Sequence, residues 1–200
     1  MAALPLVVAA LAGCGSTGTS QTHVMSDGRT MSGSSMSGMD HLTDVPDEHS
    51  ASGAADVSGP SEAAAMVCSD EIRTAVAHTL QLRSAPQGLQ AWQSPRFRCS
   101  YLVGGGELRL SVQDLDIGGP GRTFFDGLRG RLPRATPLRG VQALGFPSFE
   151  TARGDVVFLK DHKTLWVDAS RLPTGALPTG LSRTEVAYGV AAAVIACWSE

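Results

Sequence analysis

The uneven distribution of bulky apolar residues constrains this chain of 200 residues more than any other feature. Residues 15–65 contain scarcely any aliphatic bulk and are rich in Gly, Ser, Thr, Ala and Asp. Such a segment cannot bury enough apolar surface to offset the entropy that it loses on ordering. We therefore expect residues 14–65 to form a disordered tether. Nearly all aromatic and long aliphatic residues fall in 66–200, which we expect to form a single domain.

The first residues have the pattern of a secretion signal. Residues 2–12 are almost uninterruptedly apolar, but a helix of that length rises only about 18 Å. The hydrocarbon core of a bilayer is roughly 30 Å thick. The run therefore indicates the apolar part of a signal peptide and not a membrane span.

The apolar run ends in Leu11-Ala12-Gly13-Cys14, a branched apolar residue, two small residues and a cysteine. This string resembles the lipobox of bacterial lipoproteins. The resemblance implies that the Cys14 thiol receives a diacylglyceryl group and that residues 1–13 are removed. Two or three acyl chains would hold the protein stably at the outer face of the cytoplasmic membrane. The alternative is a plain secretory peptide in which the cysteine is incidental.

The tether is acidic and carries most of the methionines. Its seven acidic side chains are opposed by Arg29 alone. Thioethers and imidazoles are ligands that suit copper, and copper is the one cofactor that the sequence suggests. The candidate ligands are His23, Met25, Met31, Met36, Met39 and His41. The alternative is that methionine is simply tolerated in a low-complexity segment.

The first half of the folded part predicts one helix and one hairpin. Ser69 is a good N-cap, and apolar residues recur every four positions from Ile72, which predicts a helix over about 69–82. Residues 97–103 and 107–113 alternate between apolar and polar on either side of a glycine turn. They therefore predict an antiparallel hairpin.

The second half predicts a further helix, three strands and a closing helix. Ser182 and Glu185 have the spacing of a capping box at the start of the closing helix, whose apolar run is too short to span a bilayer. The order α-β-β-α-β-β-β-α predicts an α+β domain, with an antiparallel sheet of about five strands packed by two or three helices. The expected elements are a helix over 124–132, strands at about 144–152, 155–160 and 164–168, and a helix that ends near 198.

The folded part resembles the DUF3558-like family of actinobacterial cell-wall lipoproteins. The resemblance is carried by Cys68 before the first helix, Cys99 in the first strand, a Val-x-x-Leu-Gly segment at 141–145 and the closing helix. It implies an exported lipoprotein and supplies no activity.

Three cysteines remain if Cys14 is lipidated. An oxidising compartment favours one disulfide among them. We expect Cys68–Cys99, which would join the first helix to the first strand across about thirty residues and contribute on the order of 3 kcal/mol. Cys68–Cys197 and Cys99–Cys197 remain as alternatives.

No catalytic motif stands out in the sequence. It contains neither Gly-x-Ser-x-Gly nor His-Glu-x-x-His, and its glycine run reads as a strand turn. We interpret His78 as a structural residue of the first helix and residues 161–163 as a solvated turn. We expect Asp168 to be an exposed carboxylate beside a core strand. A basic stretch reads either as a solvated face or as a contact for anionic lipid headgroups or cell-wall polymers. It comprises Arg122, Arg129, Arg131, Arg134 and Arg139.

These patterns together predict a lipid-anchored, non-catalytic binding or accessory protein of the cell envelope. We expect the membrane as one partner, through the anchor, and an envelope protein or polymer as another. A net charge of −3 excludes a strongly basic nucleic-acid binder. Copper handling through the tether and an enzyme that acts on envelope material are the alternative functions.

Overall fold

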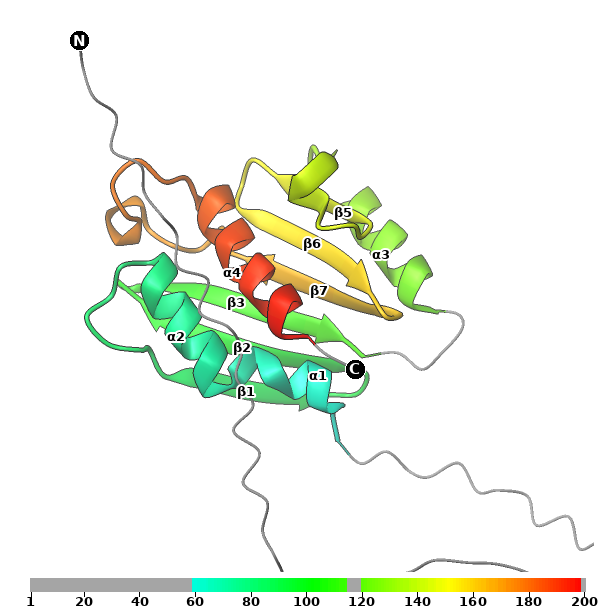
Figure 1. The fold of residues 1–200 in the computed structure, drawn as a ribbon, viewed down its shortest axis with the longest axis horizontal. Coiled ribbons are helices and arrows are strands. Elements are labelled where there is room, and N and C mark those ends of the chain that lie inside the picture. Colours follow the sequence, from blue (N-terminus) through cyan, green and yellow to red (C-terminus); the bar gives the residue numbers. More distant parts are fainter. Residues whose placement is uncertain (1–58, 115–119, 199–200) are drawn as a thin grey trace, which may run out of the picture. The chain divides into compact units, whose positions relative to one another are not determined.

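An antiparallel sheet of seven strands organises the described residues of the computed structural model, which are 59–114 and 120–198 (Figure 1). The strand order is β1-β2-β3-β7-β6-β5-β4, so two meanders meet where β3 pairs with β7. The strands are β1 (Gly88–Gln93), β2 (Arg96–Val103), β3 (Gly106–Gln113), β4 (Thr136–Pro137), β5 (Ser148–Thr151), β6 (Asp155–Lys160) and β7 (Lys163–Asp168).

Four α-helices and three short 3₁₀ turns complete the described part of the chain. The helices are α1 (Glu62–Ala65), α2 (Asp70–Thr79), α3 (Pro120–Arg131) and α4 (Arg183–Cys197). The 3₁₀ turns are η1 (Met66–Cys68), η2 (Gly140–Ala143) and η3 (Thr174–Ala176). None of the helices in these ranges is both long and apolar enough to cross a membrane.

The predicted α+β class and antiparallel sheet are confirmed, but the predicted numbers of strands and helices are wrong. The sheet gains β1 and β4 at its two edges. Strand β4 is only two residues long and contains a proline, which is tolerated at a sheet edge. The predicted strand at 144–152 shrinks to β5, because residues 144–147 form a turn after η2. The capping box of Ser182 and Glu185 is confirmed.

Helix α1 is the one that the sequence did not predict. It lies before residue 66, where the sequence analysis placed the start of the domain. The Ser61 hydroxyl accepts a hydrogen bond from the Ala64 backbone N–H at 3.2 Å, and the Ser61 N–H donates to Asp114 Oδ2 at 2.6 Å. The Ala64 side chain is fully buried. Val57–Glu200 forms a compact unit of its own.

The main core lies between the sheet and the helices α2 and α4. Every second side chain of a strand points to the same face, and the apolar ones of β2, β3 and β7 meet the two helices. Helix α4 packs against β6, β7 and α2. Its buried side chains are Val186, Ala187, Val190, Ala191, Val194 and Ile195.

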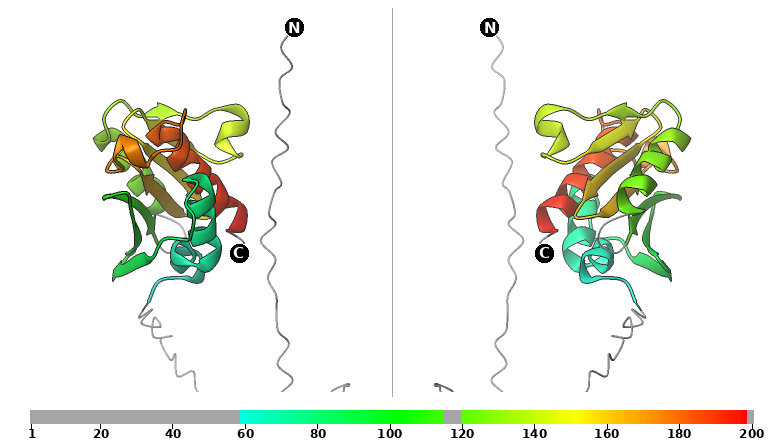
Figure 2. Two further views of the ribbon diagram at one scale, coloured as in Figure 1. Left: turned by 90° about the vertical axis from the view of Figure 1, so that its left-hand side faces the viewer. Right: turned by 90° about the vertical axis from the view of Figure 1, so that its right-hand side faces the viewer.

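The opposite face of the sheet is covered over only part of its width. Phe125 and Leu128 of α3 pack on Phe149 of β5 and Val157 of β6, and the two phenylalanine rings meet edge to face at 5.1 Å. Figure 2 shows α3 beside one end of this face, with no helix over the strands β1, β2 and β3.

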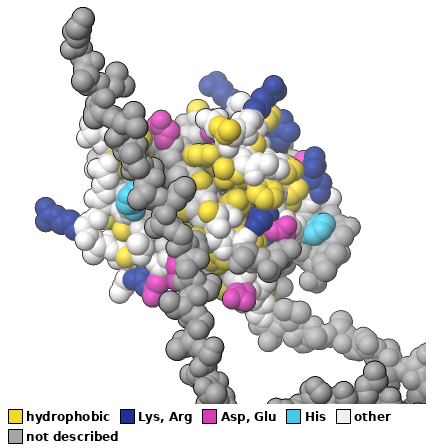
Figure 3. Space-filling view, in the orientation of Figure 1, with side chains coloured by type: hydrophobic (Ala, Val, Ile, Leu, Met, Phe, Trp, Pro, Cys, Tyr) yellow, Lys and Arg dark blue, Asp and Glu magenta, His cyan; other side chains and the backbone are white. Residues whose placement is uncertain are grey.

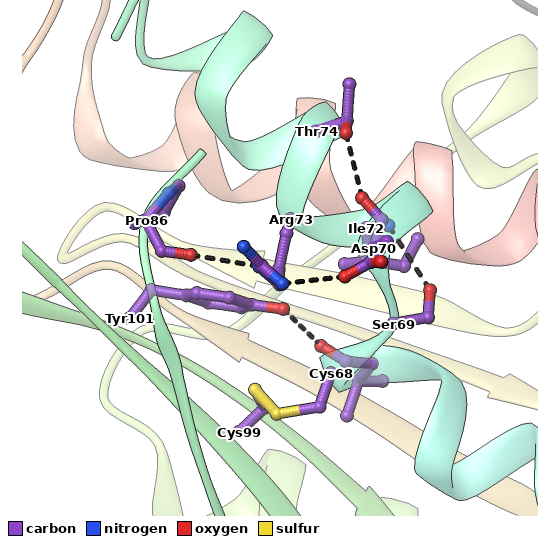
Figure 4. A network of polar contacts seen from close by, with 10 residues as sticks. Cys68, Ser69, Asp70, Ile72, Arg73, Thr74, Pro86, Cys99 and Tyr101 are labelled. Atoms are coloured by element: carbon purple, nitrogen blue, oxygen red, sulfur yellow. Dashed lines mark hydrogen bonds and ion pairs between the residues drawn. A yellow bond between two sulfur atoms is a disulfide. The ribbon is translucent and has the colours of Figure 1, made fainter. Parts of the chain in front are cut away.

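A disulfide between Cys68 and Cys99 joins η1 to β2, as the sequence predicted. This bond excludes both alternative pairings with Cys197. Next to it, the Tyr101 hydroxyl donates a hydrogen bond to the Val67 carbonyl at 2.7 Å (Figure 4). Burial raises the pKa of that hydroxyl, so it stays protonated and keeps the bond.

Strand β1 runs against this disulfide. A Cβ atom on Gly88 would lie 2.8 Å from Cys99 Sγ and 3.1 Å from the Tyr101 ring. Only glycine therefore lets β1 pair this closely with β2. The Arg73 guanidinium of α2 reaches over the Tyr101 ring (Figure 4), donating to the Pro86 carbonyl at 3.2 Å and pairing with Asp70 at 2.6 Å.

Candidate functional site: the open face of the sheet

The predicted anchor and metal ligands lie outside the described residues. These are Leu11, Ala12, Gly13 and Cys14, together with His23, Met25, Met31, Met36, Met39 and His41. Within 59–114 and 120–198, no group of three or more His, Cys, Asp or Glu side chains is placed to hold a metal ion. The anchor and copper hypotheses therefore stay predictions.

The structure shows where the polar residues singled out in the sequence lie. His78 is exposed at the end of α2. Asp161 and His162 both have positive φ in the turn between β6 and β7. The prediction of an exposed carboxylate at Asp168 is wrong, because its residue is only 9% exposed. Its Oδ1 accepts hydrogen bonds from the backbone N–H and the hydroxyl of Ser170, at 2.9 and 2.6 Å.

Asp168 belongs to a surface that we call the open face. It consists of the polar side chains of β2, β3 and β7 that point away from α2 and α4. The core positions of these strands alternate with them, which fixes their direction. The members of the open face are Arg96, Arg98, Ser100, Glu107, Arg109, Ser111, Gln113, Thr164, Trp166 and Asp168. Ser111, Gln113, Thr164 and Asp168 are buried, so the arginines, Ser100, Glu107 and Trp166 form its accessible part.

Arg98 lies at the centre of the open face. The register places it directly opposite Ser111, and Ser111 directly opposite Trp166. Directly opposed side chains have Cβ atoms about 5 Å apart, and diagonal neighbours about 7–8 Å. Arg96 precedes Arg98 by two positions on β2, and Arg109 is its diagonal neighbour on β3. The surroundings of Arg98 are therefore rich in positive charge.

The three arginines differ in what they bind. Arg109 makes two bonds to the Glu107 carboxylate, at 3.2 and 2.7 Å. Arg96 donates to Gln113 Oε1 at 3.2 Å and lies 5.5 Å from the centre of the Phe124 ring of α3. Arg98 has no hydrogen-bond or ion-pair partner within the described part of the chain. Arg98 is a half-buried residue, and its guanidinium is therefore available to a ligand.

Glu107 binds positive charge from two elements. Its Oε2 pairs with Arg109 at 2.7 Å and with Arg171 at 3.1 Å. Burial raises the pKa of Glu107, but hydrogen bonds from Ser100 and Arg109 and the charges of Arg109 and Arg171 outweigh it. The net result is a pKa below the ordinary value of 4.5. The carboxylate is therefore ionised at neutral pH and pairs with Arg109.

Replacing Glu107 by glutamine is expected to lower the free energy of unfolding at pH 7 by about 1 kcal/mol. Because the folded-state pKa is lowered, the ionised carboxylate stabilises the fold above its unfolded pKa, and this contribution is lost as pH falls through the folded-state pKa. Urea titrations should therefore show a difference at pH 7 that shrinks below about pH 4.5. Glu150→Gln is the matched control, and a Glu107→Gln effect that is equal at pH 3.5 and 7 would contradict the assignment.

Trp166 lies across Ser111 from Arg98 and is held by a buried carboxylate. Its indole N–H donates to Asp155 Oδ1 at 3.0 Å, and the Thr151 hydroxyl donates to Asp155 Oδ2 at 2.6 Å. Asp155 is only 5% exposed, so its bonds fix the indole plane. The half-buried ring of Trp166 thus forms a rigid apolar wall between the open face and α3.

An open depression lies at one end of the open face, where the β2–β3 turn meets the segment after β7. Leu102, Gly105, Gly106, Glu107 and Arg171 line it. It is shallow and open to solvent. The arrangement as a whole fits a ligand that lies across a surface, because its groups are spread over several strands.

The alternation in the sequence predicts which side chains of β2 and β3 face away from the core, but not that a helix leaves them uncovered. Arg98, Arg109 and Ser111 therefore escaped prediction. No model of a known protein family, no curated protein and no solved structure matches this chain.

Proposed function

We propose that the chain is a lipid-anchored binding or accessory protein outside the cytoplasm, and that the open face binds an anionic ligand of the cell envelope. The observation that carries the binding role is Arg98, a half-buried arginine with no partner in the described residues. Guanidinium groups bind carboxylates and phosphates through two parallel hydrogen bonds.

The disulfide between Cys68 and Cys99 supports a location outside the cytoplasm, because structural disulfides persist in oxidising compartments. The lipobox-like string that ends at Cys14 supports the anchor. The resemblance to the DUF3558-like lipoproteins belongs to the same proposal, and the closing helix α4 agrees with it. An extended polymer fits the open face better than a small substrate does, since the charged groups span three strands.

Binding of acidic polymers by the full chain tests this proposal. Polygalacturonate supplies carboxylates, poly(glycerol phosphate) supplies phosphates, and dextran is the neutral control. We expect binding of an acidic polymer that weakens as salt rises, and a loss of about tenfold in affinity in Arg98→Gln, the effect of one charge-assisted hydrogen bond. Isothermal titration calorimetry measures both.

The matched control is Arg83→Gln, which removes an exposed arginine outside the open face. It should keep the affinity of the unchanged protein. Equal affinity for dextran, or equal losses in Arg98→Gln and Arg83→Gln, would overturn the binding role of the open face. Neither result would bear on the anchor at Cys14.

A further inference from the structure

The turn η2 exposes two aliphatic side chains at the edge of the domain. The Val141 side chain is 90% exposed, more than any other large apolar residue in the described ranges, and Leu144 is 38% exposed. Single exposed aliphatic residues are common on protein surfaces. Here, however, two of them lie in one short turn, which is the Val-x-x-Leu-Gly segment at 141–145. The proposed binding function assigns no role to this segment.

The backbone of this turn is held in an unfavourable conformation. Leu144 has φ 53° and ψ 23°, in the left-handed region. Bulky residues rarely adopt this region, because it brings Cβ close to the following carbonyl oxygen. The Leu144 N–H donates to the Val141 carbonyl at 3.2 Å, and the Phe146 N–H to the Ala143 carbonyl at 2.9 Å. A strained residue that the fold holds in place is typical of functional segments.

Positively charged residues precede the turn in the sequence. Residues 127–149 contain four arginines and no Lys, Asp or Glu. All four side chains are exposed: Arg129, Arg131, Arg134 and Arg139. Figure 3 shows Lys and Arg side chains at the upper edge of the molecule, but Figure 2 places α3, with Arg129 and Arg131, on the other side of the sheet from η2. The arginines that lead into the turn are therefore Arg134 and Arg139.

We propose that η2 and its flanks, residues 139–144, form a membrane-contact tip that inserts Val141 and Leu144 into the interface of an anionic lipid bilayer. The arginines would bind the lipid phosphates while the aliphatic side chains enter the acyl boundary. An acidic polymer would satisfy the arginines alone and would give the exposed Val141 no apolar surroundings. The combination of the two features therefore favours lipid.

This contact is independent of the proposed acyl anchor and adds to it. The acyl chains at Cys14 would supply the stable attachment, and the tip would add a second contact at the domain itself. The tip would also fix the orientation of the domain at the membrane.

Sedimentation with vesicles tests the tip without the anchor. Residues 57–200 form a compact unit of their own and lack Cys14, so this fragment is used. We expect it to bind vesicles of equal phosphatidylglycerol and phosphatidylcholine, and to bind phosphatidylcholine alone much more weakly. Val141→Asp should lower binding about tenfold or more, and Arg139→Gln about fivefold, which corresponds to roughly 1 kcal/mol for each charge near the surface.

The controls make the same substitutions elsewhere. Leu102→Asp alters a side chain on β2 that is 64% exposed, and Arg83→Gln removes an exposed arginine; both should bind as the unchanged fragment does. Equal losses in Val141→Asp and Leu102→Asp would overturn the proposal. So would binding of poly(glycerol phosphate) with the same affinity as vesicles and no effect of Val141→Asp, which would indicate a polymer-binding surface.

A second measurement reports on insertion directly. In the same fragment, brominated acyl chains should quench the added fluorescence of Val141→Trp and leave that of Leu102→Trp unchanged. Equal quenching of both variants would contradict insertion by the tip. An Arg98→Gln fragment should bind vesicles normally, so the proposals for the open face and for the tip fail separately.

Discussion

Replacing Cys68 and Cys99 together by serine is expected to lower the free energy of unfolding by about 3 kcal/mol. In the chain-entropy account, the bond that closes this 31-residue separation limits the unfolded ensemble, and its loss releases that entropy. The Tyr101 hydroxyl and the Val67 carbonyl should still pair, so we expect a native fold of reduced stability. Urea unfolding at neutral pH, followed by circular dichroism, measures the change.

The control for this prediction is a reducing agent. With the bond reduced in the unchanged protein, the two proteins should unfold at nearly the same urea concentration. A stability difference that stays below about 0.5 kcal/mol without reductant, or one that persists with it, would contradict the stabilising role of the Cys68–Cys99 bond.

Replacing Cys14 by serine is expected to move the protein from the membrane fraction to the soluble fraction. A serine hydroxyl cannot form the thioether that carries the diacylglyceryl group, so the acyl chains would be lost. Fractionation of the producing cells by ultracentrifugation, with immunoblotting, measures the distribution. Ser20→Ala is the matched control and should stay with the membrane.

The membrane-contact tip affects how this result is interpreted. A small amount of the Cys14→Ser protein should remain in the membrane fraction, and this amount should disappear when the Val141→Asp substitution is added. Full retention of Cys14→Ser and of the double variant would contradict the anchor.

Sequence patterns predicted the strands whose apolar residues alternate or form a continuous run, and missed the strands that have neither pattern. Strands β2, β6 and β7 were expected close to their true bounds. In β1 the positions facing the core include Gly88, which must be small beside the disulfide, and Gln90. No apolar alternation therefore exists there to be detected.

Helix α1 was missed for a different reason. Ser61 is a good N-cap and three alanines follow Glu62, which together favour a helix. The segment was assigned to the tether because it has no large apolar side chain. Its contribution comes from Ala64, which is buried although it is small.

The open face could not be predicted from the sequence, because it depends on where α3 packs in the folded domain. The alternation along β2 and β3 correctly places Arg98 and Arg109 away from the core. Whether a helix covers them depends on α3, which Phe125 and Leu128 hold over β5 and β6 instead. The sequence has no local signal for that choice.

The mass of the N-terminal tryptic peptide from membrane-bound protein tests lipid anchoring most directly. We expect a peptide of residues 14–29 that begins at Cys14 and carries a diacylglyceryl group, with residues 1–13 absent. A peptide that still contains residues 1–13, or one that carries an unmodified Cys14, would contradict the anchored, extracytoplasmic account.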